Sequence, residues 1–230
     1  MSDKNLQEWT AKWLIALFRS DQPDVGVLKG LDQINWSALT HAYGQAEDVP
    51  SLLRALLSQD KDHREFACQL LHETIWHQGD ICQASAYTVP FLYAMLEASE
   101  TPDKALVAFL IASLADGQPS WERILADKER EAEWRIILAR SGESLEARVI
   151  KERAEIKATR DAIRERLPLL YPYLEHEEPA VRGHIAKALG YYPERVQEFL
   201  PILEKMLVSE TDQFTIEDIQ EAIARVKENC

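Results

Sequence analysis

Apolar residues recur at three- and four-residue steps along most of the chain, the spacing that places side chains on one face of an α-helix. Four such stretches carry a proline as their second residue, namely Val49–Leu57, Val89–Leu96, Leu167–Leu174 and Leu200–Leu207. The four prolines are 40, 78 and 33 residues apart, so the middle gap is about two periods long. This repeat predicts helix pairs stacked into a solenoid, in which each unit buries its apolar face against its neighbours.

The same pattern predicts an N-terminal cap over residues 1–44. Leu6–Phe18 places three- and four-spaced apolar residues, including Trp9 and Trp13, on one helical face. We expect a second short helix from Asn35 to Gly44, because asparagine favours a helix start and glycine favours a helix end.

Two helix pairs are expected over residues 48–116. The first pair has a helix with a proline in its first turn and a partner that starts near Asp62 and ends at Gly79, where glycine can adopt a left-handed conformation. Pro90 falls inside the next helical stretch, so we expect a kink or a break just before it. Ala105–Leu114 is apolar nearly all round, which predicts a helix at the centre of the stack.

Residues 120–166 depart from the regular repeat. They contain no proline and intersperse both charge signs, a composition typical of long helices with exposed ion pairs. Ser141-Gly142 is expected to divide this enlarged repeat into helices at Trp121–Arg140 and Leu145–Arg166, with Trp121, Ile124, Leu125, Trp134, Ile137 and Leu138 as the buried face of the first. Two C-terminal repeats follow over 167–230, so that 1–230 forms a single domain.

The C-terminal repeats also carry the clearest motif. Pro179–Arg182, followed by Ala186 and then Ala188–Gly190, resembles the HEAT-repeat consensus. The resemblance implies an all-α fold, a right-handed α-α superhelix of the HEAT-like or armadillo type, with about four to five helix pairs. In that family an arginine and an acidic residue form a ladder between repeats; by position, the arginines would be Arg64 and Arg182, and the acidic residues Asp62, Glu177 and Glu178.

A second resemblance covers residues 36–98. Its motifs are Trp36-x-x-Leu39-x-His41-Ala42-Tyr43-Gly44, Asp48-Val49-Pro50, Ile75-Trp76-His77-Gln78-Gly79 and Ala84-x-Ala86-Tyr87-x-Val89-Pro90-Phe91-Leu92. These are similar to a group of bacterial HEAT-repeat proteins that have no assigned chemistry and include candidate toxin-immunity proteins. The resemblance implies a protein-interaction role, either as a toxin-immunity protein or as a regulator.

Charge narrows the choice of partner. The formal net charge is −13: residues 1–118 carry 8 basic and 16 acidic groups, 119–165 carry 11 of each, and 166–230 carry 7 and 12. No segment has the basic excess that a phosphate backbone requires, so nucleic acid is not expected, although a local basic patch could survive this averaging. An acidic surface suits a basic protein partner.

Three cysteines without paired spacing favour a reducing, cytoplasmic location. The N-terminus does not read as a signal peptide, and no stretch approaches the ~20 apolar residues that a membrane helix needs.

No motif specifies catalysis, a cofactor or a metal. Cys68 and His72 are four residues apart, but the paired CxxC or HxxxH spacing of a zinc site is missing. His41 and His77 each precede a glycine near the expected end of a helix, where a histidine can cap the terminal carbonyls. Alternatively, these two histidines converge as a polar rim that recognises a partner.

The concave face of a solenoid is lined by the second helix of each pair, and this face binds partners. The candidate partner-binding residues on it are Arg64, His72, Glu73, Trp76, His77, Arg182, His184 and Lys187. The alternatives are a HEAT-like enzyme, either a DNA glycosylase, which the acidic charge disfavours, or a bilin lyase, and a homo-oligomer assembled through residues 120–165.

Overall fold

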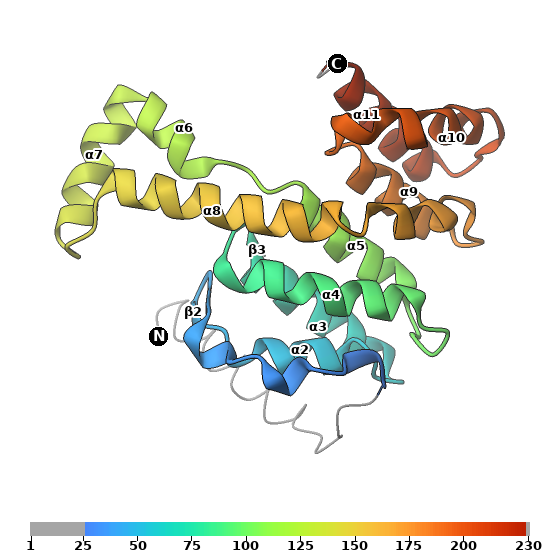
Figure 1. Ribbon diagram of the computed structural model, residues 1–230, viewed down its shortest axis with the longest axis horizontal. Helices are drawn as coiled ribbons and strands as arrows, with labels where there is room; N and C mark the ends of the chain where they lie inside the picture. Colours follow the sequence, from blue (N-terminus) through green and yellow to red (C-terminus); the bar gives the residue numbers. More distant parts are fainter. Residues whose placement is uncertain (1–25, 229–230) are drawn as a thin grey trace.

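The computed structural model describes residues 26–228, and the helix predicted over Leu6–Phe18 lies outside them. The fold is all-α, with successive helices packed side by side as in a solenoid (Figure 1). The helices are α2 Val49–Ala55, α3 Lys61–Ile75, α4 Gln83–Glu97, α5 Lys104–Ala115, α6 Ser120–Ala126, α7 Lys128–Ala139, α8 Leu145–Arg164, α9 Pro179–Leu189, α10 Val196–Ser209 and α11 Gln213–Glu228. Short 3-10 helices are η1 Gly26–Leu28, η2 Leu31–Gln33, η3 Trp36–Ala38, η4 Leu167–Glu175 and η5 Pro193–Arg195.

The helices are paired as α2 with α3, α4 with α5, η4 with α9, and α10 with α11. The second helices of these pairs pack in the order α3, α5, α9, α11, so that α9 lies directly against α5 although α6, α7 and α8 separate them in sequence. Helix α8 packs along α4 and also touches α5, whereas α6 and α7 extend away from the pairs (Figure 1).

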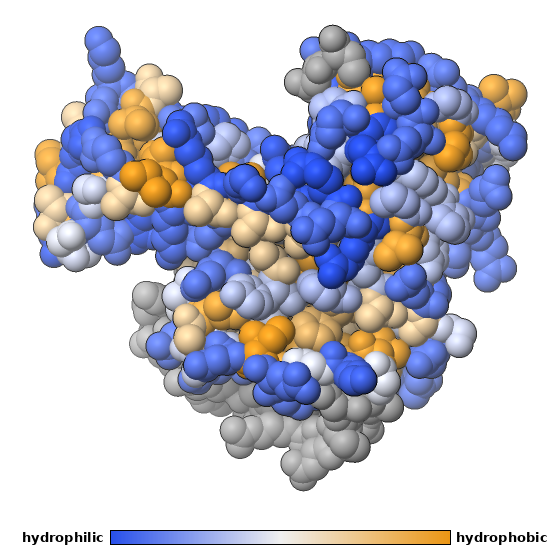
Figure 2. All heavy atoms as spheres, viewed as in Figure 1, coloured by the Kyte–Doolittle hydropathy of each residue, from blue (hydrophilic) through white to orange (hydrophobic). Residues whose placement is uncertain are grey.

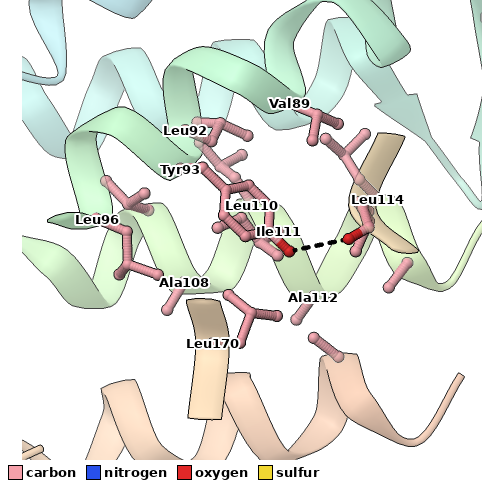
Figure 3. Close-up of a cluster of buried hydrophobic side chains, with 14 of the residues drawn as sticks. Val89, Leu92, Tyr93, Leu96, Ala108, Leu110, Ile111, Ala112, Leu114 and Leu170 are labelled. Carbon is pink, nitrogen blue, oxygen red and sulfur yellow. Dashed lines mark hydrogen bonds between the residues drawn. The ribbon is translucent and has the colours of Figure 1, made fainter. Parts of the chain in front are cut away.

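A cluster of buried hydrophobic side chains lies where α4, α5 and η4 meet (Figure 3). Helix α5 is buried on most of its circumference, which confirms the prediction of a central helix. Tyr93 of α4 is 2% exposed, and its hydroxyl donates a hydrogen bond of 3.4 Å to the carbonyl of Ile163 at the end of α8. Each fully buried aliphatic or aromatic side chain in such a cluster contributes about 1.5–3 kcal/mol.

The prolines do not all begin helices. Pro50 and Pro168 lie in the first turns of α2 and η4, but Pro90 and Pro201 lie inside α4 and α10. Of the kink or break expected before Pro90, the break is wrong, since α4 is continuous through this residue. Both internal prolines are on the exposed side of their helices, where water can hydrate the carbonyl that has lost its amide partner. Residues 167–175, in turn, form a 3-10 helix instead of an α-helix.

Two short hairpins replace predicted helix ends. The helix expected from Asn35 to Gly44 is wrong: after η3 the chain forms β1 Thr40–His41, which pairs with β2 Gly44–Gln45. At the end of α3, β3 Trp76–His77 pairs with β4 Asp80–Ile81. The turn between β3 and β4 has φ 55° at Gln78 and φ 97° at Gly79, the pattern of a type I′ hairpin turn. Gly79 is left-handed as predicted, but in a hairpin and not in a helix cap.

The charged segment contains three helices where two were predicted. Asp127 divides the expected Trp121–Arg140 helix, because its carboxylate accepts hydrogen bonds from the amides of Glu129 and Arg130 and so starts α7. The predicted division at Ser141-Gly142 is confirmed, with Gly142 at φ 73°. We call α6, α7 and the first part of α8, residues 120–150, the arm. The arm has a small core of its own, formed by Ile124, Leu138 and Leu145 with Trp121, Leu125 and Trp134, while Ile137, predicted to be buried, is 40% exposed.

Helix α9 lies very close to α11. A Cβ added at Gly190 would be 2.8 Å from Cα of Ala222, which leaves room for no side chain but hydrogen. Asp212 caps the start of α11, because its Oδ1 accepts a hydrogen bond of 2.9 Å from the amide of Thr215.

Arg64 and Arg182 occupy equivalent places in α3 and α9. Arg64 donates to the carbonyls of the residues six and five positions before it, at 2.9 and 3.1 Å, and Arg182 does the same at 2.6 and 2.9 Å. Arg182 also binds both carboxylate oxygens of Glu210, each at 2.8 Å, and so links α9 to the loop before α11. The acidic residue that pairs with the ladder arginine in the third repeat is therefore Glu210, and not Glu177 or Glu178 as predicted.

We expect Glu210→Gln to lower the free energy of unfolding by about 2 kcal/mol, because it leaves an enclosed guanidinium without its charge partner. Hydrogen bonds from Arg182 lower the pKa of Glu210 to about 2. The stabilisation by this carboxylate is therefore complete above its ordinary pKa of 4.5 and is lost as the pH falls towards 2. Urea unfolding at pH 7 and at pH 3 measures both effects.

The control is Glu198→Gln, which alters an exposed pair with Arg195 and should change the unfolding midpoint little. Equal destabilisation by the two variants would contradict the role given to Glu210.

Candidate partner-binding site

Four aromatic rings, three of them on second helices and one on β3, form a continuous row, which we call the aromatic–histidine row. Trp76 stacks on His72 of α3 with ring centroids 4.5 Å apart and planes at 24°. The His72 ring lies 4.8 Å from that of Phe109 on α5, and Phe109 in turn meets His184 of α9 edge to face at 5.6 Å. The row therefore crosses the three helices and is contributed by segments more than a hundred residues apart in the chain.

The row ends in a group of charges on α9 and α11. Nδ1 of His184 lies 3.8 Å from a carboxylate oxygen of Asp218, and Nζ of Lys187 lies 3.7 Å from the other. Lys187 also lies 3.5 Å from Glu221. The side chains of His184 and Lys187 remain 28% and 34% exposed, so both can contact a partner as well as their neighbours.

Burial controls the protonation of the row. Desolvation lowers the pKa of His72, and the nearby Glu73 carboxylate opposes this only in part. Desolvation likewise lowers the pKa of His184, with Asp218 acting in the opposite direction and Lys187 adding to the decrease. Both imidazoles are therefore neutral at pH 7, and the middle of the row is an apolar surface with polar edges.

A second group of polar side chains lies at the two hairpins, and we call it the tyrosine–histidine cluster. The Tyr43 hydroxyl is 3.1 Å from Nδ1 of His77, and the same nitrogen is 3.3 Å from a carboxylate oxygen of Glu73. The amide of Tyr43 donates to Nδ1 of His41 at 3.0 Å, while Nε2 of that ring lies 2.9 Å from Asp48. Burial and the charge of Glu73 raise the pKa of Tyr43. The two histidines therefore converge on one tyrosine, from hairpins and not from helix ends.

The eight predicted residues fall into three places. His72, Trp76, His184 and Lys187 lie in or beside the row, and Glu73 and His77 lie in the tyrosine–histidine cluster. Arg64 and Arg182 are engaged with loop carbonyls. Sequence reasoning missed Phe109, which it treated as core, and Tyr43, whose exposure of 43% is unusual for an aromatic residue.

Neither Cys68 nor Cys82 is a reactive thiol. Burial raises the pKa of the Cys68 thiol to about 12 and that of Cys82 to about 11, so both are protonated at neutral pH. Within residues 26–228, no group of three or more His, Cys, Asp and Glu side chains is arranged to hold a metal ion. Across the same residues, no helix is both long enough and apolar enough to cross a membrane.

Helix pairs with close second-helix packing are the architecture of a HEAT-type solenoid. The model of the HEAT-repeat family matches residues 132–224, which supports the predicted family. HEAT repeats generally mediate protein–protein interaction. No curated protein matches the chain. Among solved structures, the crystal structure of an engineered protein is 19% identical over 99% of this chain and 92% of its own, with a TM-score of 0.33.

Low pH should destabilise the protein in part because His72 and His184, in the aromatic–histidine row, resist protonation in the folded state. A histidine whose pKa is lowered in the folded state binds fewer protons than it does when unfolded, so its contribution to stability is lost as the pH falls below the ordinary value of 6.5. We expect the double variant His72→Gln/His184→Gln to flatten the decline in unfolding free energy between pH 7 and pH 5. Urea titrations across this range measure it.

His63→Gln is the control, since it removes an imidazole at the exposed start of α3, outside the row. An unchanged pH dependence in the double variant would contradict the burial of these two rings as its cause.

Proposed function

We propose that this chain is a non-catalytic interaction module that binds a protein partner through the aromatic–histidine row. The observation that carries this is the unbroken ring contact from Trp76 through His72 and Phe109 to His184, which crosses three helices on the face that HEAT-type solenoids use for partners. Aromatic side chains that are partly exposed and held by packing are typical anchors of protein interfaces.

The charges around the row favour a basic partner. Glu73 lies near one end, and Asp218 and Glu221 lie at the other beside Lys187, so the three carboxylates outnumber this lysine around a neutral aromatic centre. Arginine and lysine side chains of a partner would bind such a surface by ion pairing at the ends and by cation–π contact in the middle. The net charge of −13 adds long-range attraction for a basic protein.

Within this class we favour a toxin-immunity or regulatory protein that holds a basic protein in an inactive complex. The predicted contacts are His72, Trp76, His184 and Lys187, with Glu73 and His77 as the rim. Arg64 and Arg182 would act as positioning residues, because their bonds to loop carbonyls hold the beginnings of α3 and α9. The tyrosine–histidine cluster supports a continuous surface, since Glu73 and His72 are adjacent on α3.

The test is capture followed by affinity measurement. The tagged chain is used to capture proteins from its own cell extract, the product of the adjacent gene is included as a candidate, and the dissociation constant of any recovered protein is measured by calorimetry. We expect His72→Ala and His184→Ala each to weaken the complex by about tenfold or more, as loss of an interface anchor does.

His63→Ala is the matched control, because it lies on α3 but at the exposed first turn. It should bind as the unaltered chain does, and circular dichroism should show that all three variants are folded. Recovery of no protein partner, or equal binding by the row variants and the control, would remove the proposal. An acidic or neutral partner would remove the basic-toxin version alone.

A further inference from the structure

A pocket of about 390 Å³ lies beside α8, away from the row. One wall is the connection between α5 and α6, including Gly117 and Pro119, and another is α6 itself. The main wall is α8, where strongly hydrophilic side chains gather in the hollow between the arm and the C-terminal helices (Figure 2). This volume is within the range of about 300–1,000 Å³ that is usual for small-molecule sites.

The α8 wall is basic. Arg153, Lys157, Arg160 and Arg164 follow one another at spacings of four, three and four residues, which places them on a single helical face. The acidic lining residues are Glu122 and Asp161, so the lining carries four positive and two negative charges, a net of +2. Glu194, which holds Arg164 at 2.6 Å, reduces the local net charge to +1. A positive pocket in a chain of charge −13 marks a site for an anion.

The four cations are not equivalent. Arg153 is engaged by Glu122 at 2.6 Å, and Lys157 and Arg164 share Asp161. Arg160 instead donates from one terminal nitrogen to the carbonyl oxygen of Gly117 at 3.2 Å. Its Nε is enclosed and has no hydrogen-bond partner among the described residues. Because no carboxylate among the described residues pairs with Arg160, the charge of its guanidinium group is left for an anion in the pocket.

The wall opposite Arg160 is fixed in place. A Cβ at Gly117 would lie 2.4 Å from Cγ1 of Ile81, so only glycine allows the connection to pass this close to β4. The amide of Gln118 also donates to the carbonyl of Gly79 at 2.8 Å. Because backbone contacts hold this wall, the pocket is formed before any ligand arrives, which reduces the ordering cost of binding.

We infer that this pocket binds a small molecule that carries a phosphate or diphosphate group, with Arg160 as its central contact. Guanidinium groups match phosphate oxygens in a two-pronged geometry, and several cations on one helical face can share one polyanion. The inference does not depend on the proposed partner, since the pocket lies on α8 and the row lies on α3, α5 and α9.

Inorganic pyrophosphate is the probe, titrated by calorimetry at constant ionic strength set with chloride. We expect saturable binding with one site. Arg160→Gln should weaken pyrophosphate binding by about tenfold or more, the usual effect of losing a charge-assisted hydrogen bond.

Glu122→Gln should tighten pyrophosphate binding by about threefold, because it frees Arg153 and adds one unit of positive charge. A gain in affinity cannot come from misfolding, so this variant tests the site even if Arg160→Gln is unstable.

Arg130→Gln is the matched control, an exposed arginine on α7 outside the pocket. Absence of saturable binding would overturn the inference, and so would an effect of Arg130→Gln equal to that of Arg160→Gln. Displacement of pyrophosphate by a short DNA duplex at lower concentration would overturn the small-molecule assignment.

Discussion

The direct packing of α9 against α5 is the contact on which the rest of the architecture depends. It requires a central helix that is apolar on nearly every side, because α5 also packs against α3, α4 and α8. It also requires that the three helices between α5 and α9 leave the layer of second helices. Since they do, the second helices form an uninterrupted surface, and Phe109 can touch His72 on one side and His184 on the other. The aromatic–histidine row exists because this layer has no gap.

The displaced segment has a structural consequence of its own. Helix α8 returns along α4, so its first half projects with α6 and α7 as the arm, while its second half passes the connection that leaves α5 (Figure 1). The pocket lies at this crossing. Tyr93 ties the C-terminal end of α8 to the core through the Ile163 carbonyl, and the buried Glu152 side chain accepts the amides of Trp121 and Glu122 at 2.9 and 3.1 Å, which fixes α6 against α8. The displacement of α6, α7 and α8 from the layer of second helices therefore produces both the aromatic–histidine row and the pocket.

Much of the fold could be predicted from sequence because helix pairs and the HEAT motif are local patterns. Lys104–Ala115 lies close to the predicted helix Ala105–Leu114, and Pro179–Leu189 covers the HEAT motif, since apolar spacing and turn residues define both. The hairpin at Gly79 could not be predicted, because a glycine at the end of a helical stretch is suited both to a helix cap and to a type I′ turn. What selects the hairpin at Gly79 is contact with distant residues: the Ser85 hydroxyl donates to the Ile75 carbonyl at 2.6 Å, and Gln118 bonds the Gly79 carbonyl.

The candidate sites were predictable to different degrees for a related reason. Residues of the row share helical faces that the repeat pattern identifies, so His72 and His184 could be placed on one surface from sequence, although Phe109 was taken as core. The basic pocket could not be predicted from the net charge of sequence segments, because residues 119–165 carry 11 charges of each sign. A helix sorts its charges by face, so a segment of zero net charge can present a positive surface. Mean charge thus argues against an extended phosphate backbone, which needs a long basic surface, but it does not argue against one phosphate group held by the single face of α8.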